Sequence, residues 1–236
     1  MPEALLQRIA AIVIPRHCIV CGLQSAAGAI CSGCFADLPW IGSACRYCAM
    51  PLANAKAAQL GCGRCQRQPW PFDFVVAPLR YAFPLSAMLK ACKYQRRAFY
   101  APALGALLAS RVGERAAGIE AVVPVPLHWW RHRQRGFNQA AELARPLARR
   151  LGLPLWQGVR RVRHSPPQSG LTEQQRRQNL SNVFATSARS PWRSVLIVDD
   201  VITTGTTVRE LAVTLRRAGV RKIAVAAVAR AVAGRA

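Results

Sequence analysis

The stretch VLIVDDVITTGTT, residues 195–207, indicates both the fold and a candidate site. Its four aliphatic residues, Val195–Val198, run directly into two adjacent aspartates, although the whole chain contains only four aspartates. A short, uninterrupted aliphatic run is typical of a central parallel strand that is buried on both faces. We therefore expect a buried strand whose carboxyl end presents Asp199 and Asp200.

The segment after the aspartates predicts a turn followed by a helix. Apolar residues recur through residues 208–218 at the spacing of one helix face, and Gly219 closes the segment. Thr203–Thr207 then occupy the strand-to-helix turn at the carboxyl end of the sheet, where open α/β folds bind ligands. Unpaired N–H groups at the helix start, threonine hydroxyls and the close approach that Gly205 permits together form a phosphate cradle. The pattern is neither a Walker loop nor a GxGxxG dinucleotide turn.

Two carboxylates just ahead of a phosphate cradle suit a sugar phosphate. The phosphate would bind at the helix start, and Asp199 and Asp200 would accept hydrogen bonds from vicinal ribose hydroxyls. The alternative interpretation is an ordinary strand, turn and helix in which an aspartate serves only as a cap.

Beyond residue 70 the chain alternates between strand-like and helix-like segments, which predicts a parallel sheet covered by helices on both faces. The stretch QPWPFDF, residues 68–74, marks a domain boundary, so we expect domains at 1–70 and 71–236. Pro146 lies inside one predicted helix and should kink or interrupt it. The predicted strands are Phe74–Pro78, Ala121–Val125, Val195–Val198 and Lys222–Ala229, and the predicted helices are Leu85–Tyr94, Pro102–Arg111, Asn138–Leu151 and Val208–Ala218.

Eight of the nine cysteines form four CxxC pairs, each of which aims two sulfurs at one point and supplies half of a tetrahedral site. Four half-sites predict two structural Zn²⁺ sites, with metal replacing the core that so short a segment cannot build. Sequential pairing is favoured because it closes shorter loops, but the spacing leaves other pairings open. Redox chemistry at one pair is the alternative, and Cys92 is expected in a helix rather than as a ligand. The pairs are Cys18/Cys21, Cys31/Cys34, Cys45/Cys48 and Cys62/Cys65.

The formal charge of +23 is extreme for 236 residues, and arginine supplies most of it. Such a field attracts phosphates, nucleic acid or an anionic membrane, although simple solvation of these side chains is the alternative. The N-terminal stretch MPEALLQRIAAIVIP is too short to span a bilayer and lacks the pattern of a secretory signal. It is typical of a short amphipathic helix that ends near Pro15. We therefore expect a cytoplasmic protein without stable membrane insertion.

Residues 195–207 resemble the phosphoribosyl pyrophosphate (PRPP) motif of type I phosphoribosyltransferases. The segments PVPLHWWRHRQRGFNQA, residues 124–140, and HSPPQSGLTEQQRRQNLSNVF, residues 164–184, resemble the ComF family of GntX-like, competence-associated proteins. The resemblance covers nearly the full chain and implies an α/β fold, a type I phosphoribosyltransferase-like parallel sheet preceded by a small zinc-ribbon domain. The PRPP-binding residues that it implies are Asp199, Asp200, Val201, Thr203, Thr204, Gly205, Thr206 and Thr207.

In the type I enzymes, an acceptor nitrogen attacks C1 of magnesium-bound PRPP, and pyrophosphate leaves. Fixed cations stabilise the charge that grows on this leaving group. Candidates here are Lys93 and the arginines that follow the strand at Ala121–Val125, although these arginines could also merely solvate a loop. Asn138 is expected to cap the following helix. The candidate arginines are Arg131, Arg133 and Arg135. His128 and His132 lie close to them in the sequence, and for each histidine the alternatives are contact with the ligand or an incidental position.

Three functions remain open at this point. The first is transfer of phosphoribosyl to an acceptor that nothing in the sequence identifies, with residues 164–184 closing as a flap or forming a plain surface loop. The second, which the family resemblance implies, is binding of single-stranded DNA in competence and DNA uptake, together with proteins of the competence machinery. Trp129 and Trp130 would then stack on bases, whereas partial burial is the commoner use of a tryptophan. The third is sensing of PRPP without turnover.

Overall fold

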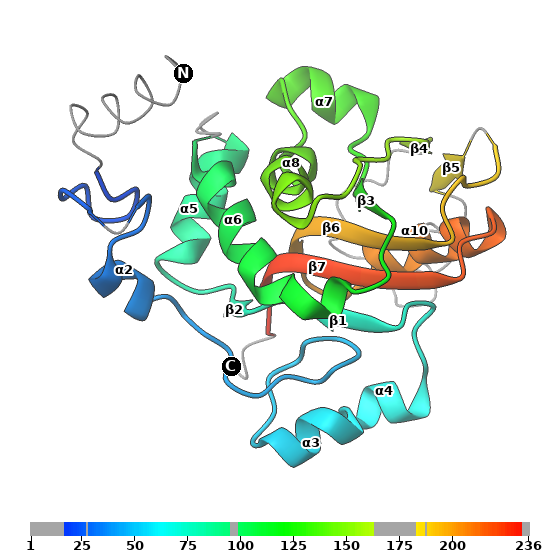
Figure 1. Cartoon of the computed structure of the whole chain (residues 1–236), viewed down its shortest axis with the longest axis horizontal. Helices are drawn as coiled ribbons and strands as arrows, with labels where there is room; N and C mark the ends of the chain where they lie inside the picture. Colours follow the sequence, from blue (N-terminus) through cyan, green and yellow to red (C-terminus); the bar gives the residue numbers. More distant parts are fainter. Residues whose placement is uncertain (1–16, 27, 95–98, 163–182, 187, 233–236) are drawn as a thin grey trace, which may run out of the picture.

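The computed structural model describes residues 17–26, 28–94, 99–162, 183–186 and 188–232. Its centre is a parallel sheet in the order β1-β7-β6-β3. The strands are β1 (Phe74–Val76), β3 (Ala121–Pro124), β6 (Ser194–Ile202) and β7 (Lys222–Arg230), and β2 (Leu79–Arg80) continues the register of β1 along β7. Figure 1 shows this twisted sheet between layers of helices.

Helices cover both faces of the sheet, as the alternating sequence predicts. On one face lie α5 (Leu85–Tyr94), α6 (Tyr100–Val112) and α8 (Gln139–Leu151), and on the other lies α10 (Thr206–Arg217) (Figure 1). Alternate residues of β6 enter the two cores. Leu196 and Val198 pack in the core under α5, α6 and α8, whereas Val195 and Ile197 pack in the core with α10. The expected strand buried on both faces is therefore confirmed.

The remaining elements are short. A 3₁₀ turn, η1 (Gly113–Ala116), follows α6, and an antiparallel ribbon joins β4 (Val159–Arg161) to β5 (Phe184–Thr186). The cysteine-rich region holds three short helices: α2 (Ser32–Ala36), α3 (Ala55–Leu60) and α4 (Gly63–Arg67). One further helix, α7 (Trp129–Arg135), lies in a segment for which the sequence analysis predicts no helix.

Two boundaries differ from the sequence-based expectation at the candidate site. The strand β6 continues to Ile202, because β7 runs beside it as far as Arg230 and extends the ladder. Asp199 and Asp200 therefore lie within the strand rather than after it. Helix α10 begins at Thr206, so the turn itself is shorter than expected and consists of residues 203–205.

Pro146 does not interrupt helix α8, which contrasts with the expectation of a break. The helix continues to Leu151, although proline removes one hydrogen bond of the backbone. The ring of Pro146 faces α6 at Gly105, where an added methyl group would lie only 2.4 Å from Pro146 Cγ. Close packing of the two helices at this point holds the proline within a continuous helix.

The cysteine-rich region lies along the β1–β2 edge of the sheet. Val75 N–H donates to the carbonyl of Arg46 (3.0 Å), and Arg80 N–H donates to the carbonyl of Pro39 (2.8 Å). An open edge strand is prone to pair with other chains, and these contacts occupy it. The division near residue 70 remains a prediction, since the two parts of the chain share backbone hydrogen bonds.

Two expected segments fall on undescribed parts of the chain. The amphipathic helix before Pro15 lies outside the described residues, and so does the flap at 164–184 except for its last two residues. Among the helices that the structure describes, none has the length and apolar character needed to cross a membrane.

Candidate functional site

The two aspartates end the buried part of β6 and point toward different sides of the sheet. The pleat that sends Leu196 and Val198 into the core under α5 directs Asp200 the same way, and Asp199 the opposite way. Lys93, in the last turn of α5, places its Nζ 3.7 Å from Oδ2 of Asp200. The structure thus brings together Lys93 and the aspartate pair, which are 106 to 107 positions apart in the sequence.

Backbone hydrogen bonds orient the two carboxylates. Asp199 Oδ1 accepts from the N–H of Asp200 at 2.9 Å, and Asp200 Oδ1 accepts from the N–H of Val201 at 2.9 Å. Burial, followed by the negative charge of Asp200, raises the pKa of Asp199 well above its ordinary value, while Lys93 acts in the opposite direction. A bound cation or a set of hydroxyl donors would favour the ionised pair. The carboxylate oxygens are also ligands that suit Mg²⁺.

The turn after β6 opens onto the amino end of α10. Gly205 is the N-cap residue, with a φ of +81°, and offers no side chain to the first N–H groups of the helix. Thr204 Oγ1 lies 2.7 Å from Thr206 Oγ1 and accepts from the Thr206 N–H at 3.4 Å. The N-cap residue itself supplies no side-chain cap. A helix start attracts anions through its N–H groups and its dipole. The turn therefore has the local features of the phosphate cradle that the sequence predicts, and phosphate binding there stays a prediction.

The predicted arginines lie on α7, which a capping histidine and a glycine delimit. His128 Nδ1 accepts from the N–H of Trp130 at 3.3 Å, and Gly136 ends the helix in the left-handed conformation. Arg135 donates to Gln139 Oε1 at 3.5 Å, toward the start of α8. The helix is therefore capped at both ends. Within the described part of the chain, His128 has a structural role as the N-cap residue.

Asn138 caps α8, as predicted. Its Oδ1 accepts from the N–H of Ala140 at 3.1 Å, and its Nδ2 donates to the carbonyl of Val125 at 3.0 Å. This second bond ties the start of α8 to the carboxyl end of β3, the neighbour of β6 in the sheet.

A cavity of about 980 Å³ lies beside the carboxyl end of β3, between α7, α8 and the β4 segment. Of the predicted cations, Arg133 lines it, together with His132. Its wall also contains Arg160 and Arg161, so its character is strongly basic. The structure thus gathers cations from α7 and β4 at the same end of the sheet as the aspartate pair.

Arg161 is a site residue that the sequence does not reveal. Its Nε is buried and has no hydrogen-bond partner within the described part of the chain. Burial, then the positive charge of Arg131, lowers the pKa of Arg161, and the negative charge of Asp199 opposes this shift. Arg161 thus lies in the field of both groups. The pairing of β4 with β5 brings Arg161 to this position, and no local sequence pattern predicts that pairing.

The eight paired cysteines form two clusters in sequential order, so the favoured pairing is confirmed. Within each cluster the four sulfurs lie within 4.8 Å of one another. Backbone N–H groups surround the sulfurs, as where Cys62 N–H donates to Cys45 Sγ at 3.3 Å. Four convergent thiols fit a structural zinc ion. The first cluster is Cys18, Cys21, Cys31 and Cys34, and the second cluster is Cys45, Cys48, Cys62 and Cys65.

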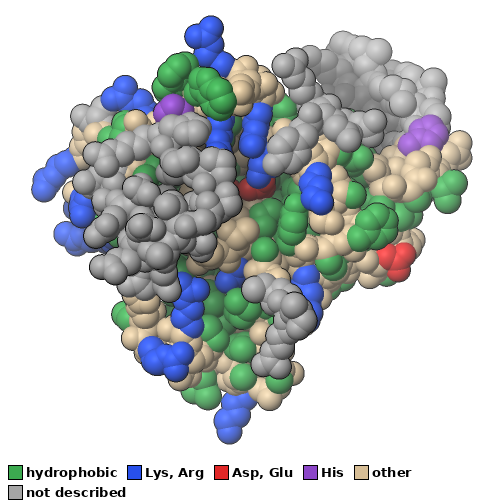
Figure 2. Space-filling view, turned by 180° about the vertical axis from the view of Figure 1, so that it is seen from behind, with side chains coloured by type: hydrophobic (Ala, Val, Ile, Leu, Met, Phe, Trp, Pro, Cys, Tyr) green, Lys and Arg blue, Asp and Glu red, His purple; other side chains and the backbone are tan. Residues whose placement is uncertain are grey.

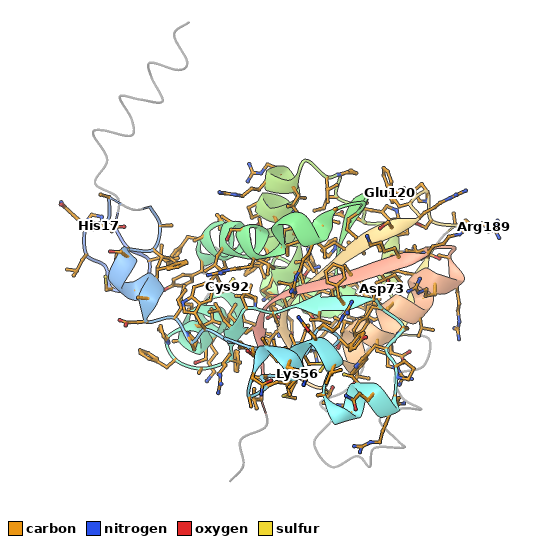
Figure 3. The ribbon with its side chains drawn as sticks, turned by 60° about the horizontal axis from the view of Figure 1, so that its bottom comes forward. His17, Lys56, Asp73, Cys92, Glu120 and Arg189 are labelled. Atoms are coloured by element: carbon orange, nitrogen blue, oxygen red, sulfur yellow. The ribbon has the colours of Figure 1, made fainter. Side chains whose placement is uncertain are left out.

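Cys92 is a buried helix residue, as expected. It lies on α5, where Figure 3 labels it, and takes no part in either cluster. Burial, with the negative charge of Asp200 as a lesser cause, raises the pKa of its thiol to about 11. A thiol with so high a pKa is largely unreactive at neutral pH.

Comparisons with known proteins agree with this two-part description. A double zinc ribbon domain matches residues 9–66, and a phosphoribosyl transferase domain matches residues 138–236. Competence protein F of Haemophilus influenzae is 37% identical over 226 residues, which cover 91% of this chain and 97% of that protein. The DNA utilization protein YhgH of Escherichia coli K12 is 36% identical over 223 residues, which cover 91% of this chain and 96% of that protein.

Among solved structures, the glutamine PRPP amidotransferase from B. subtilis, complexed with ADP and GMP, is 24% identical with a TM-score of 0.37. The match covers 54% of this chain and 25% of that chain. The parallel sheet, the two four-cysteine clusters and the two domain matches all confirm a phosphoribosyltransferase-type α/β fold preceded by a double zinc ribbon. With identity above one third over almost the full length of its relatives, this chain belongs to the ComF family of competence-associated proteins.

Proposed function

We propose that this protein binds magnesium-bound PRPP at the junction of β6 and α10 and transfers its phosphoribosyl group to a nitrogen acceptor. One observation carries the proposal: the Asp199–Asp200 pair near the end of β6 is separated only by residues 201–205 from the start of α10, where the N-cap residue Gly205 supplies no side-chain cap. The 5-phosphate would bind the N–H groups of Thr206 and Thr207, and the carboxylates would accept hydrogen bonds from the ribose hydroxyls.

The cations around the aspartates would serve the leaving group. In the proposed reaction the bond between C1 and the pyrophosphate oxygen breaks, its electron pair leaves with pyrophosphate, and a C1–N bond forms while the acceptor nitrogen loses a proton to solvent. Mg²⁺ would neutralise charge on the pyrophosphate. Lys93, Arg131 and Arg161 would add fixed positive charge on both sides of the sheet.

Binding of single-stranded DNA is a second candidate function, and the surface of α7 favours it. Trp129 is 62% exposed and Trp130 is 46% exposed. Neither side chain is therefore largely buried, which is the commoner environment of a tryptophan. Arg131 and Arg133 follow on the same helix. Exposed aromatic rings beside arginines suit base stacking and phosphate contact. Figure 2 shows basic side chains spread over one face of the molecule, with few acidic ones.

Calorimetric titration of the zinc-loaded protein with PRPP and Mg²⁺ tests the first function. The comparison is an Asp199→Asn/Asp200→Asn double variant, with inorganic tripolyphosphate as a control ligand because a charge of +23 attracts any polyanion. We expect the double change to abolish PRPP binding and to leave tripolyphosphate binding in place. PRPP binding that survives in the folded variant would contradict the proposal.

Two further measurements separate the alternatives. Release of pyrophosphate in the presence of amine and nucleobase acceptors distinguishes a transferase from a PRPP sensor, which would bind without release. For DNA, a Trp129→Ala/Trp130→Ala variant should lose affinity for a single-stranded oligonucleotide but keep the salt dependence that its arginines cause. Unchanged DNA affinity in this variant would remove α7 as the DNA surface.

A further inference from the structure

The second cysteine cluster lies against the same loop that receives the proposed phosphate. Arg230, at the end of β7, is only 2% exposed and connects the two. Its Nε donates to the carbonyl of Cys48 at 2.9 Å. Its Nη1 donates to the carbonyl of Ile202 at 2.8 Å and also to the carbonyl of Thr203. One buried guanidinium therefore joins a cysteine of the metal site to the last residue of β6 and the first residue of the turn that follows it.

The electrostatic environment of Arg230 also depends on this cluster. A buried guanidinium is costly unless it is hydrogen-bonded and its charge is balanced. The hydrogen bonds described for Arg230 go to neutral carbonyl groups. A zinc ion with four thiolates carries a net charge of about −2, which would balance the arginine.

Trp70 makes a second, independent connection between the cluster and the loop. Its indole Nε1 donates to Cys65 Sγ at 3.1 Å. The far edge of the same ring lies under Gly205, where an added methyl group would be 3.0 Å from Cη2. The ring is held in place by stacking on Phe72, with centroids 5.2 Å apart. Trp70 thus spans the distance from a metal-binding sulfur to the N-cap of α10.

The first cluster has no comparable connection among the described residues. Its nearby tryptophan, Trp40, donates its indole N–H to the carbonyl of Phe35 and contacts Arg111 of α6. Figures 1 and 3 place α2, with the first cluster, well apart from α3 and α4. The molecule therefore contains a built-in control, namely one cysteine cluster that contacts the loop and one that does not.

We propose that the second metal centre is a positioning site for the phosphate loop, and that Arg230 and Trp70 transmit its state to Ile202–Gly205. While the centre is loaded, the two side chains hold the loop in the conformation that receives phosphate. Loss of that metal frees the loop and weakens ligand binding, whereas loss of the first metal does not. By reciprocity, a bound ligand must make the second metal harder to remove. The ligand part of this proposal rests on the proposed PRPP function, but the coupling of metal to loop does not.

Hydrogen–deuterium exchange tests the coupling without any ligand. The protein is compared with Cys62→Ala, which lacks one ligand of the second cluster, and with Cys31→Ala, its counterpart in the first cluster. We expect peptides that contain residues 201–208 to exchange about tenfold faster in Cys62→Ala and at the original rate in Cys31→Ala. Peptides from β3 report whether the sheet remains folded. Equal loop exchange in the protein and Cys62→Ala, with β3 protected, would overturn the proposal.

Two side-chain variants test the path. Trp70→Phe removes the N–H···S bond and also the edge of the indole ring that lies under Gly205. Arg230→Met removes the guanidinium, and Trp40→Phe is the matched control at the first cluster. Both path variants should retain two zinc ions by elemental analysis and still show faster loop exchange, and Trp40→Phe should not. Unchanged loop exchange in Trp70→Phe contradicts the indole path, and this milder variant decides the matter if Arg230→Met does not fold.

Zinc transfer to the chromophoric chelator 4-(2-pyridylazo)resorcinol gives the ligand-dependent measurement. PRPP with Mg²⁺ should slow release of one of the two zinc ions about tenfold and leave the other unchanged. The slowing should be lost in Trp70→Phe. If calorimetry shows that PRPP does not bind at all, the proposed function fails, while the exchange experiment still decides the coupling. If PRPP binds but slows neither ion, the proposed coupling is wrong.

Discussion

At the scale of single residues, the site depends on two adjacent carboxylates that face opposite sides of one sheet. Asp200 meets Lys93 on the side of α5. Asp199 lies in the field of Arg161 on the side of the β4–β5 ribbon. Cations approach the pair from both sides, yet the pKa of Asp199 stays raised because burial and Asp200 outweigh them. Asp199 therefore keeps its proton to a higher pH than an ordinary aspartate does, and a ligand with Mg²⁺ must displace that proton where it is present.

Proton release on ligand binding follows from this raised pKa. Binding of magnesium-bound PRPP requires the ionised pair, so affinity should rise with pH until the raised pKa of Asp199 is passed, and then level off. Calorimetry in two buffers of different ionisation enthalpy measures the number of protons released. We expect release in the native protein, and the number of protons released should fall as the pH rises through the raised pKa of Asp199. Equal heats in the two buffers for the native protein would contradict the prediction.

The same carboxyl group should make stability depend on pH. Because the folded-state pKa of Asp199 is raised above its ordinary value of 3.8, its contribution to stability is full below that value. The contribution is lost as pH rises through the folded-state pKa. The difference in unfolding free energy between the native protein and Asp199→Asn should therefore move in favour of the variant as pH rises from about 4 toward neutrality. Urea unfolding of both proteins across this range checks the sign, and a pH-independent difference would refute it.

At the scale of elements, the layer above the sheet depends on the close crossing of α6 and α8. Gly105 and Pro146 form the point of contact, and Ala144 and Leu147 of α8 are fully buried beside it. A side chain at Gly105 would meet not only the proline ring but also the carbonyl of Leu143, at 2.6 Å. A backbone atom cannot rotate away, so the spacing of the helices is set by the absence of a side chain at this position.

Gly105→Ala should therefore destabilise the fold, although alanine favours a helix by about 1 kcal/mol over glycine. The overlap with Leu143 and Pro146 outweighs this gain, and we expect a net loss of about 1–3 kcal/mol in unfolding free energy. Gly42→Ala is the matched control, because a methyl group there meets no atom within 4 Å. Chemical unfolding measures both variants. A more stable Gly105→Ala would show that the helices can separate without cost.

Elements with a strong local pattern were predictable, and those that depend on neighbours were not. The predicted helix Leu85–Tyr94 is confirmed at both ends, and the aliphatic run at residues 195–198 correctly predicted a central strand. The extension of β6 to Ile202 depends on the length of β7, which no local pattern reports. Helix α7 was not predicted because WWRHRQR lacks the spaced apolar residues of a buried helix face. Its ends are defined by the cap residue His128 and by Gly136.

The same reasoning applies to the site residues. The CxxC spacing predicted the sequential clusters, because ligands close in sequence close the shortest loops. The roles of Trp70, Arg161 and Arg230 come only from contacts between distant segments, such as the hydrogen bond between Arg230 and Cys48, 182 positions apart. The sites of PRPP and Mg²⁺ binding stay predictions.

At the scale of the whole molecule, the zinc ribbon and the sheet complete one another. The ribbon covers the β1–β2 edge through backbone hydrogen bonds from Val75 and Arg80, and through Ile41, whose N–H donates to the carbonyl of Pro78 at 2.8 Å. Figure 3 shows Asp73 at the start of β1 and Lys56 on α3, on the side of the molecule where the ribbon meets the sheet. A segment of this size has little core of its own, so its metal ions help to keep the edge covered.

Removal of both metals should therefore cause self-association as well as loss of stability. Without zinc, the ribbon unfolds and uncovers backbone groups of β1 and β2, whose unpaired N–H and C=O groups then offer a template for a second chain. Light scattering should rise after treatment with a strong zinc chelator, the thermal midpoint should fall, and prompt addition of Zn²⁺ should restore both. EGTA with excess Ca²⁺ serves as a control for added chelator. A metal-free protein that shows no rise in light scattering and an unchanged thermal midpoint would contradict this prediction. The packing of the ribbon against β1 and β2 would then be sufficient to cover the edge of the sheet without the metals.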